Sequence, residues 1–330
     1  MRTLPAIVVG ILLRLSTSAA AQQAPPIPGG LGLDTWTRGL GIDAGTQGPP
    51  GLLLFYRLID FSAHTARDGS GNALPIPGLK IGARANAAAV LFTAKPRGAP
   101  YLNVVASLPL ASVSFVSDVP PVALHNHGLA DIFIGALRAG WKLSRYDVVT
   151  GYGFYVPVGR FDPRDAASVG RGYWIDQFAL GGAAYFDSTR NERASVLVSY
   201  ERNRPRRGIE SKRGDLLEVQ GGAGWPVYRN VSAGVAGYAL WQVSDDRGAE
   251  LAPELAGMHT RAFGLGPEID VTIPKRRMRV ELRTEWDFGV VARPQGLVLV
   301  VGVEYLAWMP AITTAASPPA RSSGRPGSPP

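Results

Sequence analysis

The sequence predicts an all-β protein, a transmembrane antiparallel up-and-down β-barrel of about twelve strands. Three observations support this fold class: an export signal at the N-terminus, charge alternation over 277–288, and about a dozen similar segments joined by alternately long and short connections. Side chains alternate faces along a strand, so 277–288 has one charged and one apolar face. Such a strand also fits a soluble sandwich; the export signal and the loop lengths favour the barrel.

The N-terminus has the composition of a signal peptide. Arg2 precedes an apolar run over 6–15 and a small-residue stretch over 16–21, which predicts a signal peptide at 1–21 with cleavage after Ala21. The remaining chain has no run of about 18 apolar residues, so a membrane span must be built from barrel strands. We therefore expect export to the outer membrane of a Gram-negative bacterium. The absence of Cys excludes a disulfide scaffold and thiolate metal sites.

Composition divides the exported chain into three parts. Residues 22–50 are rich in Pro and Gly and predict an extended arm that would occlude the lumen, 51–308 predict the barrel, and 309–330 predict a disordered tail. The expected strands are 51–61, 82–94, 101–116, 129–142, 146–158, 173–186, 193–203, 215–225, 230–243, 260–273, 277–288 and 296–308.

The connections between these segments alternate in length. The long ones include 64–79, 160–172, 204–214 and 244–259, and the short ones are 95–100, 143–145, 187–192, 226–229 and 274–276. Outer-membrane barrels have long extracellular loops and tight periplasmic turns, whereas a sandwich has no reason to alternate.

The inner face of the barrel should carry the charges. An Arg that faced lipid near the midplane would cost about 2–4 kcal/mol, so the apolar positions of 277–288 are assigned to lipid. The inner wall would either conduct solutes or form salt bridges that fill a narrow lumen. The predicted lumen-lining residues are Arg277, Arg279, Glu281, Arg283, Glu285, Asp287, Glu201, Glu218, Tyr238 and Gln242.

Several charged residues fall at strand ends or in long loops. They would gate the extracellular mouth or brace the loops through charge-assisted hydrogen bonds. These mouth and loop candidates are Arg160, Asp162, Arg171, Asp215, Asp245 and Asp246. Asp245 and Asp246 would offer oxygen ligands to Ca²⁺, but two adjacent carboxylates fit a turn better.

The formal net charge of +8 comes mostly from Arg. An exported chain meets little nucleic acid, so we expect no nucleic-acid partner. Arg204, Arg206, Arg207, Lys212 and Arg213 would contact lipopolysaccharide phosphates, or else form a solvated charge run.

The sequence gives little support for catalysis or for a cofactor. His125 and His127 would reach one metal ion from a loop, yet no third ligand stands at a recognisable spacing. No feature pairs one Ser with one His as nucleophile and base. We therefore predict no enzyme, no cofactor and no metal.

Six ordered blocks carry a resemblance to a known family. The blocks are 151–163, 170–174, 199–203, 212–215, 237–248 and 263–268. The chain resembles the outer-membrane proteins of the meta-pathway phenol degradation family, which are described as transporters. The resemblance implies a barrel for passive uptake of small hydrophobic or aromatic compounds, with outer-membrane lipid and that solute as partners and barrel-assembly machinery during biogenesis. Fold transfers across such a family better than substrate.

Two other functions are compatible with the same pattern. A structural or adhesion barrel would bind surface lipid or polysaccharide through its long loops. A soluble periplasmic ligand-binding barrel would need a further layer over the apolar faces of 230–243 and 277–288, and the sequence predicts no helices to supply it.

Overall fold

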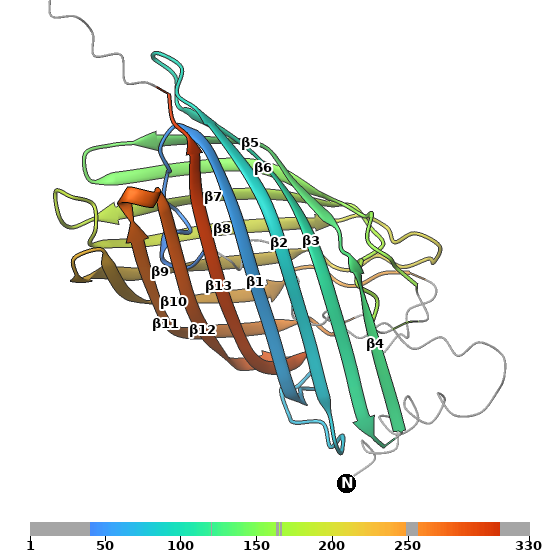
Figure 1. Ribbon diagram of the computed structural model, residues 1–330. Helices are drawn as coiled ribbons and strands as arrows, with labels where there is room; N and C mark the ends of the chain where they lie inside the picture. The colour runs from blue at the N-terminus through green and yellow to red at the C-terminus, as the bar shows by residue number, and fades with distance from the viewer. Residues whose placement is uncertain (1–39, 120, 163–164, 166, 249–256, 311–330) are drawn as a thin grey trace, which may run out of the picture.

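The computed structural model describes residues 40–119, 121–162, 165, 167–248 and 257–310 (Figure 1). The predicted signal peptide, the arm up to residue 39 and the tail from residue 311 lie outside the described residues. The elements are η2 Gly41–Asp43, β1 Gly51–Ala66, β2 Lys80–Ala94, β3 Tyr101–Asp118, β4 Pro121–Leu129, β5 Ile132–Lys142, β6 Tyr146–Val156, β7 Ile175–Tyr185, β8 Arg193–Asn203, β9 Leu216–Tyr228, β10 Val231–Gln242, β11 Arg261–Ile273, η3 Pro274–Arg276, β12 Met278–Val291 and β13 Pro294–Trp308.

The sheet closes on itself as a twelve-stranded antiparallel barrel. Neighbouring strands pair in chain order, β3 pairs with both β2 and β5, and β13 pairs with β1 from Leu52↔Trp308 to Ala66↔Pro294. The ring comprises β1–β3 and β5–β13, which confirms the predicted fold class. No helix in the described part of the chain is both long enough and apolar enough to cross a bilayer.

β4 is an additional strand that the sequence did not predict. It pairs with the outer half of β3, from Leu110↔Leu129 to Asp118↔Pro121, while β5 pairs with the inner half. β4 and β5 therefore follow one line along β3, interrupted at Ala130–Asp131. The expectation of a loop containing His125 and His127 was wrong, because this segment pairs with the outer half of β3. β1–β4 project beyond the other strands (Figure 1).

The two ends of the barrel differ as expected for an outer-membrane protein. The start of β1 and the end of β13 lie side by side, at the same end as the short turns. This end is periplasmic in barrels of this class. The turn before β12 is η3, and Arg277 closes it in the left-handed conformation with φ 53°.

The strands have an apolar outer face and a polar inner face. On β12, Leu282 and Trp286 are 47% and 55% exposed, whereas Glu281 and Arg283, on either side of Leu282, are buried. The outward residues form an apolar surface suited to lipid, and the lumen takes the charges.

We predict a depth-dependent cost for charge on this outer face. Leu180 is the central residue of β7 and is 60% exposed, whereas Tyr228 is the last residue of β9. Leu180→Arg should lower the free energy of unfolding by about 2–4 kcal/mol, and Tyr228→Arg by about 0–1 kcal/mol, because burial cost falls towards the interface. Urea unfolding in lipid vesicles measures both, with Leu180→Phe as the neutral control. Equal losses for the two Arg variants would contradict the lipid-facing assignment.

Candidate functional site

One side of the lumen is a charged wall formed by β11 and β12. Arg283 stands at its centre with a fully buried side chain. Its Nη1 lies 3.3 Å from Glu268 Oε2 and 3.4 Å from Glu281 Oε1, and its Nε lies 3.4 Å from Glu285 Oε1. Three carboxylates therefore share one guanidinium away from bulk water, where charge interactions are strong.

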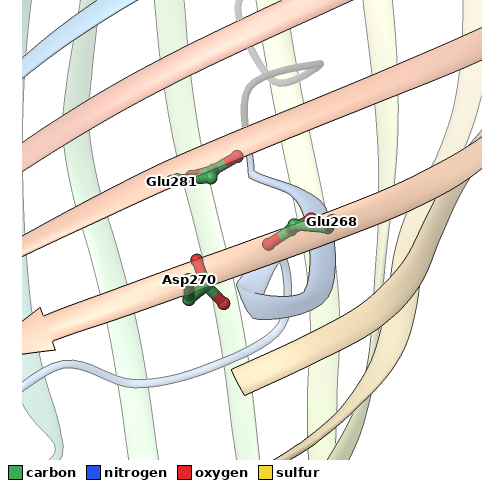
Figure 2. Close-up of side chains that lie close together, drawn as sticks. All are labelled: Glu268, Asp270 and Glu281. Atoms are coloured by element: carbon green, nitrogen blue, oxygen red, sulfur yellow. The ribbon is translucent and has the colours of Figure 1, made fainter. Parts of the chain in front are cut away.

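Glu268, Asp270 and Glu281 form the tightest carboxylate cluster of this wall (Figure 2). One oxygen from each lies within 4.8 Å of the other two. Arg279 Nη2 donates to Asp270 Oδ1 at 2.6 Å, and Arg283 occupies the opposite side of Glu268. Guanidinium groups therefore pair with these carboxylates, and the cluster is part of a salt-bridge network.

Glu268 and Asp270 were not among the residues predicted to line the lumen. They stand two residues apart on β11, so they share the inner face and meet Arg279 and Arg283 on β12. The sequence does carry a pattern that indicates this pairing. Carboxylates at positions i and i+2 in the segment before the alternating strand share one face and can pair with opposite charges on that strand.

The described part of the arm, residues 40–48, lies inside the lumen against this wall. Ile42 N donates to Glu268 Oε2 at 3.0 Å, and Ser195 Oγ donates to Ile42 O at 2.8 Å. The Asp43 carboxylate accepts from Arg193 Nε at 2.6 Å and pairs with Arg279. Burial raises the pKa of Asp43, but Arg279 and Arg193 outweigh it and hold the pKa below its usual value.

The arm is also anchored on the opposite side of the barrel. Gln47 N donates to Asp147 Oδ2 at 3.0 Å, and Arg138 Nη2 donates to Thr46 O at 2.7 Å. Gly140 makes the close approach possible, because a Cβ there would overlap the Gln47 side chain. The arm thus spans the lumen from β11 to β5 and β6.

A mostly apolar cavity lies beside the arm, on the other side of the lumen from the charged wall. The empty space among its lining residues is about 860 Å³, a volume that includes open solvent. Its apolar lining is Leu40, Phe55, Leu91, Val105, Phe133, Val149 and Leu197, and its polar lining includes Arg57, Asn103, Arg138 and Gln177.

The cavity was not predicted from the sequence. Segment 101–115 is apolar on both faces, which obscured its inner side but is what an apolar lumen wall requires. Val105 and Phe133 belong to strands that are distant in sequence from β7 and β8, so only the closed barrel brings them together with Gln177 and Leu197.

Comparison with known proteins defines the family. Residues 63–301 match the family described as "Putative MetA-pathway of phenol degradation". The chain belongs to this family. The resemblance drawn from the sequence blocks is thus confirmed. No curated protein matches the chain.

A solved structure shares the fold of this phenol-degradation family member. The COG4313 outer membrane channel from Pseudomonas putida F1 is similar with a TM-score of 0.70 and 10% identity, over 79% of this chain and 97% of that chain. The transport unit of the autotransporter AIDA-I from Escherichia coli is similar with a TM-score of 0.48 and 10% identity, over 79% and 91%. The barrel is of the outer-membrane type found in Gram-negative bacteria.

The predicted lumen residues fall on two kinds of position in this family member. The assignment of Arg277 to the lumen wall is wrong, because Arg277 is exposed in the turn before β12 and lies outside the strand. The inward-facing residues are Arg279, Glu281, Arg283, Glu285, Asp287, Glu201, Glu218, Tyr238 and Gln242. Tyr238 donates its hydroxyl to Asp287.

The predicted mouth residues on the 157–174 loop do not form one cluster, and each has different surroundings. Arg160 Nη2 donates to Asn126 Oδ1 at 2.6 Å, and Asp162 is exposed. Arg171 lies 4.9 Å from the ring centre of Tyr155, with Nη1 3.9 Å from the nearest Glu201 oxygen.

Three predicted carboxylates brace the neighbouring loops. Asp215 accepts from Asn203 N at 3.0 Å, and Asp246 accepts from Gly214 N at 2.7 Å. Asp245 lies 2.7 Å from His259 Nε2. The carboxylates of Asp245 and Asp246 therefore bond to different groups, as in a braced turn.

Several of the residues predicted to contact lipopolysaccharide already interact with other residues of the protein. Arg204 Nε donates to Asp176 at 2.7 Å, Arg207 Nη1 donates to Pro157 O at 3.3 Å, and Lys212 Nζ lies 3.5 Å from Asp215. Two assignments need correction. Arg206 lies 5.3 Å from the ring centres of both Phe161 and Tyr173, and Arg213 is buried, so neither presents its charge to a lipid surface.

We predict that the charged wall depends on Arg283. Arg283→Met should destabilise the barrel by about 3–5 kcal/mol, because it leaves three buried carboxylates without their shared partner. Adding Glu268→Gln should recover part of the loss, since the amide oxygen still accepts from Ile42 N. Denaturant unfolding in detergent or vesicles measures both. A double variant no more stable than Arg283→Met would show that charge compensation is not the role of Arg283.

Proposed function

We propose that the protein is a non-catalytic outer-membrane channel for passive uptake of small hydrophobic or aromatic compounds. The observation that carries the proposal is the apolar cavity inside a lumen whose other side is charged. Family membership, with its link to phenol degradation, supports the same substrate class.

The cavity favours an uncharged ring over a charged solute. Burial of apolar surface contributes about 25 cal/mol per Å², which favours transfer of an aromatic molecule from water into this site. The few polar groups, such as Asn103 and Gln177, would orient a hydroxyl. The charged wall attracts a solute ion weakly, because its own ion pairs neutralise much of its charge.

We further propose that the arm acts as a plug. Its described part is held by ion pairs at Asp43 and by hydrogen bonds at Thr46 and Gln47, on opposite sides of the lumen. These contacts would limit the passage of water-soluble molecules along the barrel axis.

The alternative of a structural or adhesion barrel has less support. Its binding residues would be the basic residues of 204–213, and Arg204, Arg206 and Arg207 already contact Asp176, Phe161 and Pro157.

The uptake proposal predicts that filling the cavity blocks transport. Ala179 faces the cavity and Ala184, on the same strand, faces outward. Ala179→Phe should slow uptake about tenfold, because about 1.4 kcal/mol of lost solute binding corresponds to a factor of ten. The assay follows the fluorescence of N-phenyl-1-naphthylamine as it crosses the outer membrane of intact cells. Cells that lack this protein give the baseline. Ala184→Phe is the matched control and should transport normally. Unchanged uptake by Ala179→Phe would contradict the proposal that the solute passes through this cavity.

The plug proposal predicts that weakening Asp43 opens the axial route. Asp43→Asn removes the charge that pairs with Arg193 and Arg279, so the arm should leave the lumen more often. Single-channel conductance in planar bilayers should rise relative to the native protein. Asp187→Asn, in a periplasmic turn outside the lumen, is the control. A conductance that is the same in all three proteins would show that the arm does not limit ion passage.

A further inference from the structure

The turns at the periplasmic end of the barrel carry a set of exposed cations. They lie in or beside four of the five turns described at this end, those between β2 and β3, β5 and β6, β9 and β10, and β11 and β12 (Figure 1). We call this set the basic rim. Its members are Lys95, Arg97, Lys142, Arg145, Arg229, Lys275, Arg276 and Arg277.

The cations of the basic rim have no carboxylate partners. Within the described part of the chain, no member of the rim forms an ion pair, whereas extracellular cations do, Arg84 with Asp60 and Arg204 with Asp176. The remaining periplasmic turn, between β7 and β8, holds the carboxylates at this end, and one of them, Asp187, accepts from Glu192 N at 2.9 Å within its own turn. The charge of the rim is therefore available to a partner outside the chain.

Aromatic side chains lie directly beside the rim. Lys95 Nζ lies 4.7 Å from the ring centre of Tyr101, and the Arg229 guanidinium lies 5.2 Å from the ring centre of Tyr228. Tyr and Trp at strand ends place their rings at the level of the lipid headgroups. Long cationic side chains beside such rings extend towards the polar side of the interface. The rim therefore stands at the depth of the lipid phosphates. Other exposed aromatic residues near these strand ends are Tyr146, Trp225, Tyr305 and Trp308.

Two members of the rim occupy backbone positions that do not favour arginine. Arg229 has φ 40° and Arg277 has φ 53°, both in the left-handed region. Gly, and to a lesser degree Asn, adopts this conformation at lower cost than a residue with a long side chain. A turn that needed only its shape would carry Gly or Asn here. The charge at these two positions therefore serves something other than the fold of the turn.

The rim surrounds the barrel and does not form one contact face. In the closed ring of strands, the turn between β2 and β3 lies opposite the turn between β9 and β10, and the turn between β5 and β6 lies opposite the turn between β11 and β12. An acidic protein docked on one side would leave half of these cations without a partner. A layer of lipid headgroups meets all of them.

We infer that the basic rim binds the phosphate groups of anionic phospholipids in the periplasmic leaflet and gathers these lipids around the barrel. Unpaired Lys and Arg side chains near a membrane surface attract anionic lipids, and their contributions accumulate over the set. The inference concerns the lipid around the barrel and is independent of the solute that the lumen passes.

Spin-labelled lipids measure this preference directly. The native protein is folded into phosphatidylcholine bilayers with a trace of spin-labelled phosphatidylglycerol or spin-labelled phosphatidylcholine, and electron spin resonance gives the fraction of each label immobilised at the protein surface. We expect the phosphatidylglycerol label to bind about fivefold more strongly at low salt, because cations near the surface attract its charge. At about 1 M salt, where the screening length is about 3 Å, the two labels should bind almost equally.

Two variants with the same loss of charge test the position of the site. The rim variant combines Lys95→Gln, Arg97→Gln, Lys275→Gln and Arg276→Gln, which leaves both left-handed arginines in place. Half of the rim then remains, so the preference for phosphatidylglycerol should fall to about twofold. The matched control removes exposed cations at the extracellular end and should keep the native preference. Heat-modifiable gel migration shows that each barrel is folded. The control combines Lys80→Gln, Arg202→Gln, Arg247→Gln and Arg261→Gln.

Two results overturn the inference. Equal binding of the two labels to the native protein at low salt excludes the lipid partner, and this result does not depend on any variant. Equal losses of preference in the rim variant and in the extracellular control would assign the attraction to the total charge of the protein and not to the rim.

Discussion

The rest of the structure depends on one constraint, that every backbone donor and acceptor at membrane depth must be paired within the protein. The pairing of β13 with β1 meets it by closing the sheet, and closure fixes the two faces of every strand. Outward positions must then be apolar, and charges such as Glu281 and Arg283 have only the lumen left. The register shift in β5 is therefore costly in this setting.

Closure also sets the chemistry of the lumen. A narrow barrel brings carboxylates from adjacent strands together, and Glu268, Asp270 and Glu281 are tolerable only because Arg279 and Arg283 stand among them. The arm completes this balance, since Asp43 gives Arg193 and Arg279 a further carboxylate. One half of the lumen is thus occupied by paired charge, which leaves the half between β1 and β8 for an apolar cavity.

Most of the fold could be predicted because period-two alternation, loop length and export each have a direct physical cause. Strand β8 has the predicted bounds. β12 begins one residue later than the predicted 277–288, because Arg277 adopts a left-handed conformation that alternation does not reveal, and it continues to Val291. β4 was missed because its pairing depends on how far β3 extends. The site was harder to predict, because the cavity is lined by residues from β1 to β8 that only the closed barrel brings together. Arg206 and Arg213 belong to a basic run in the sequence, but Arg206 lies near aromatic rings and Arg213 is buried.

The two halves of the lumen favour different solutes, and in the proposed function this difference lets one barrel exclude ions while it passes an apolar molecule. Water and ions need a continuous polar path, and the arm interrupts it with bonds to Asp147, Arg138 and Glu268. An aromatic solute needs only continuous apolar surface, which extends from Phe133 and Tyr155 through the cavity to Leu137 and Tyr152 on the outer face. Selectivity of the proposed uptake then follows from the lining of the cavity, because a charged solute would have to shed its water to enter an apolar site.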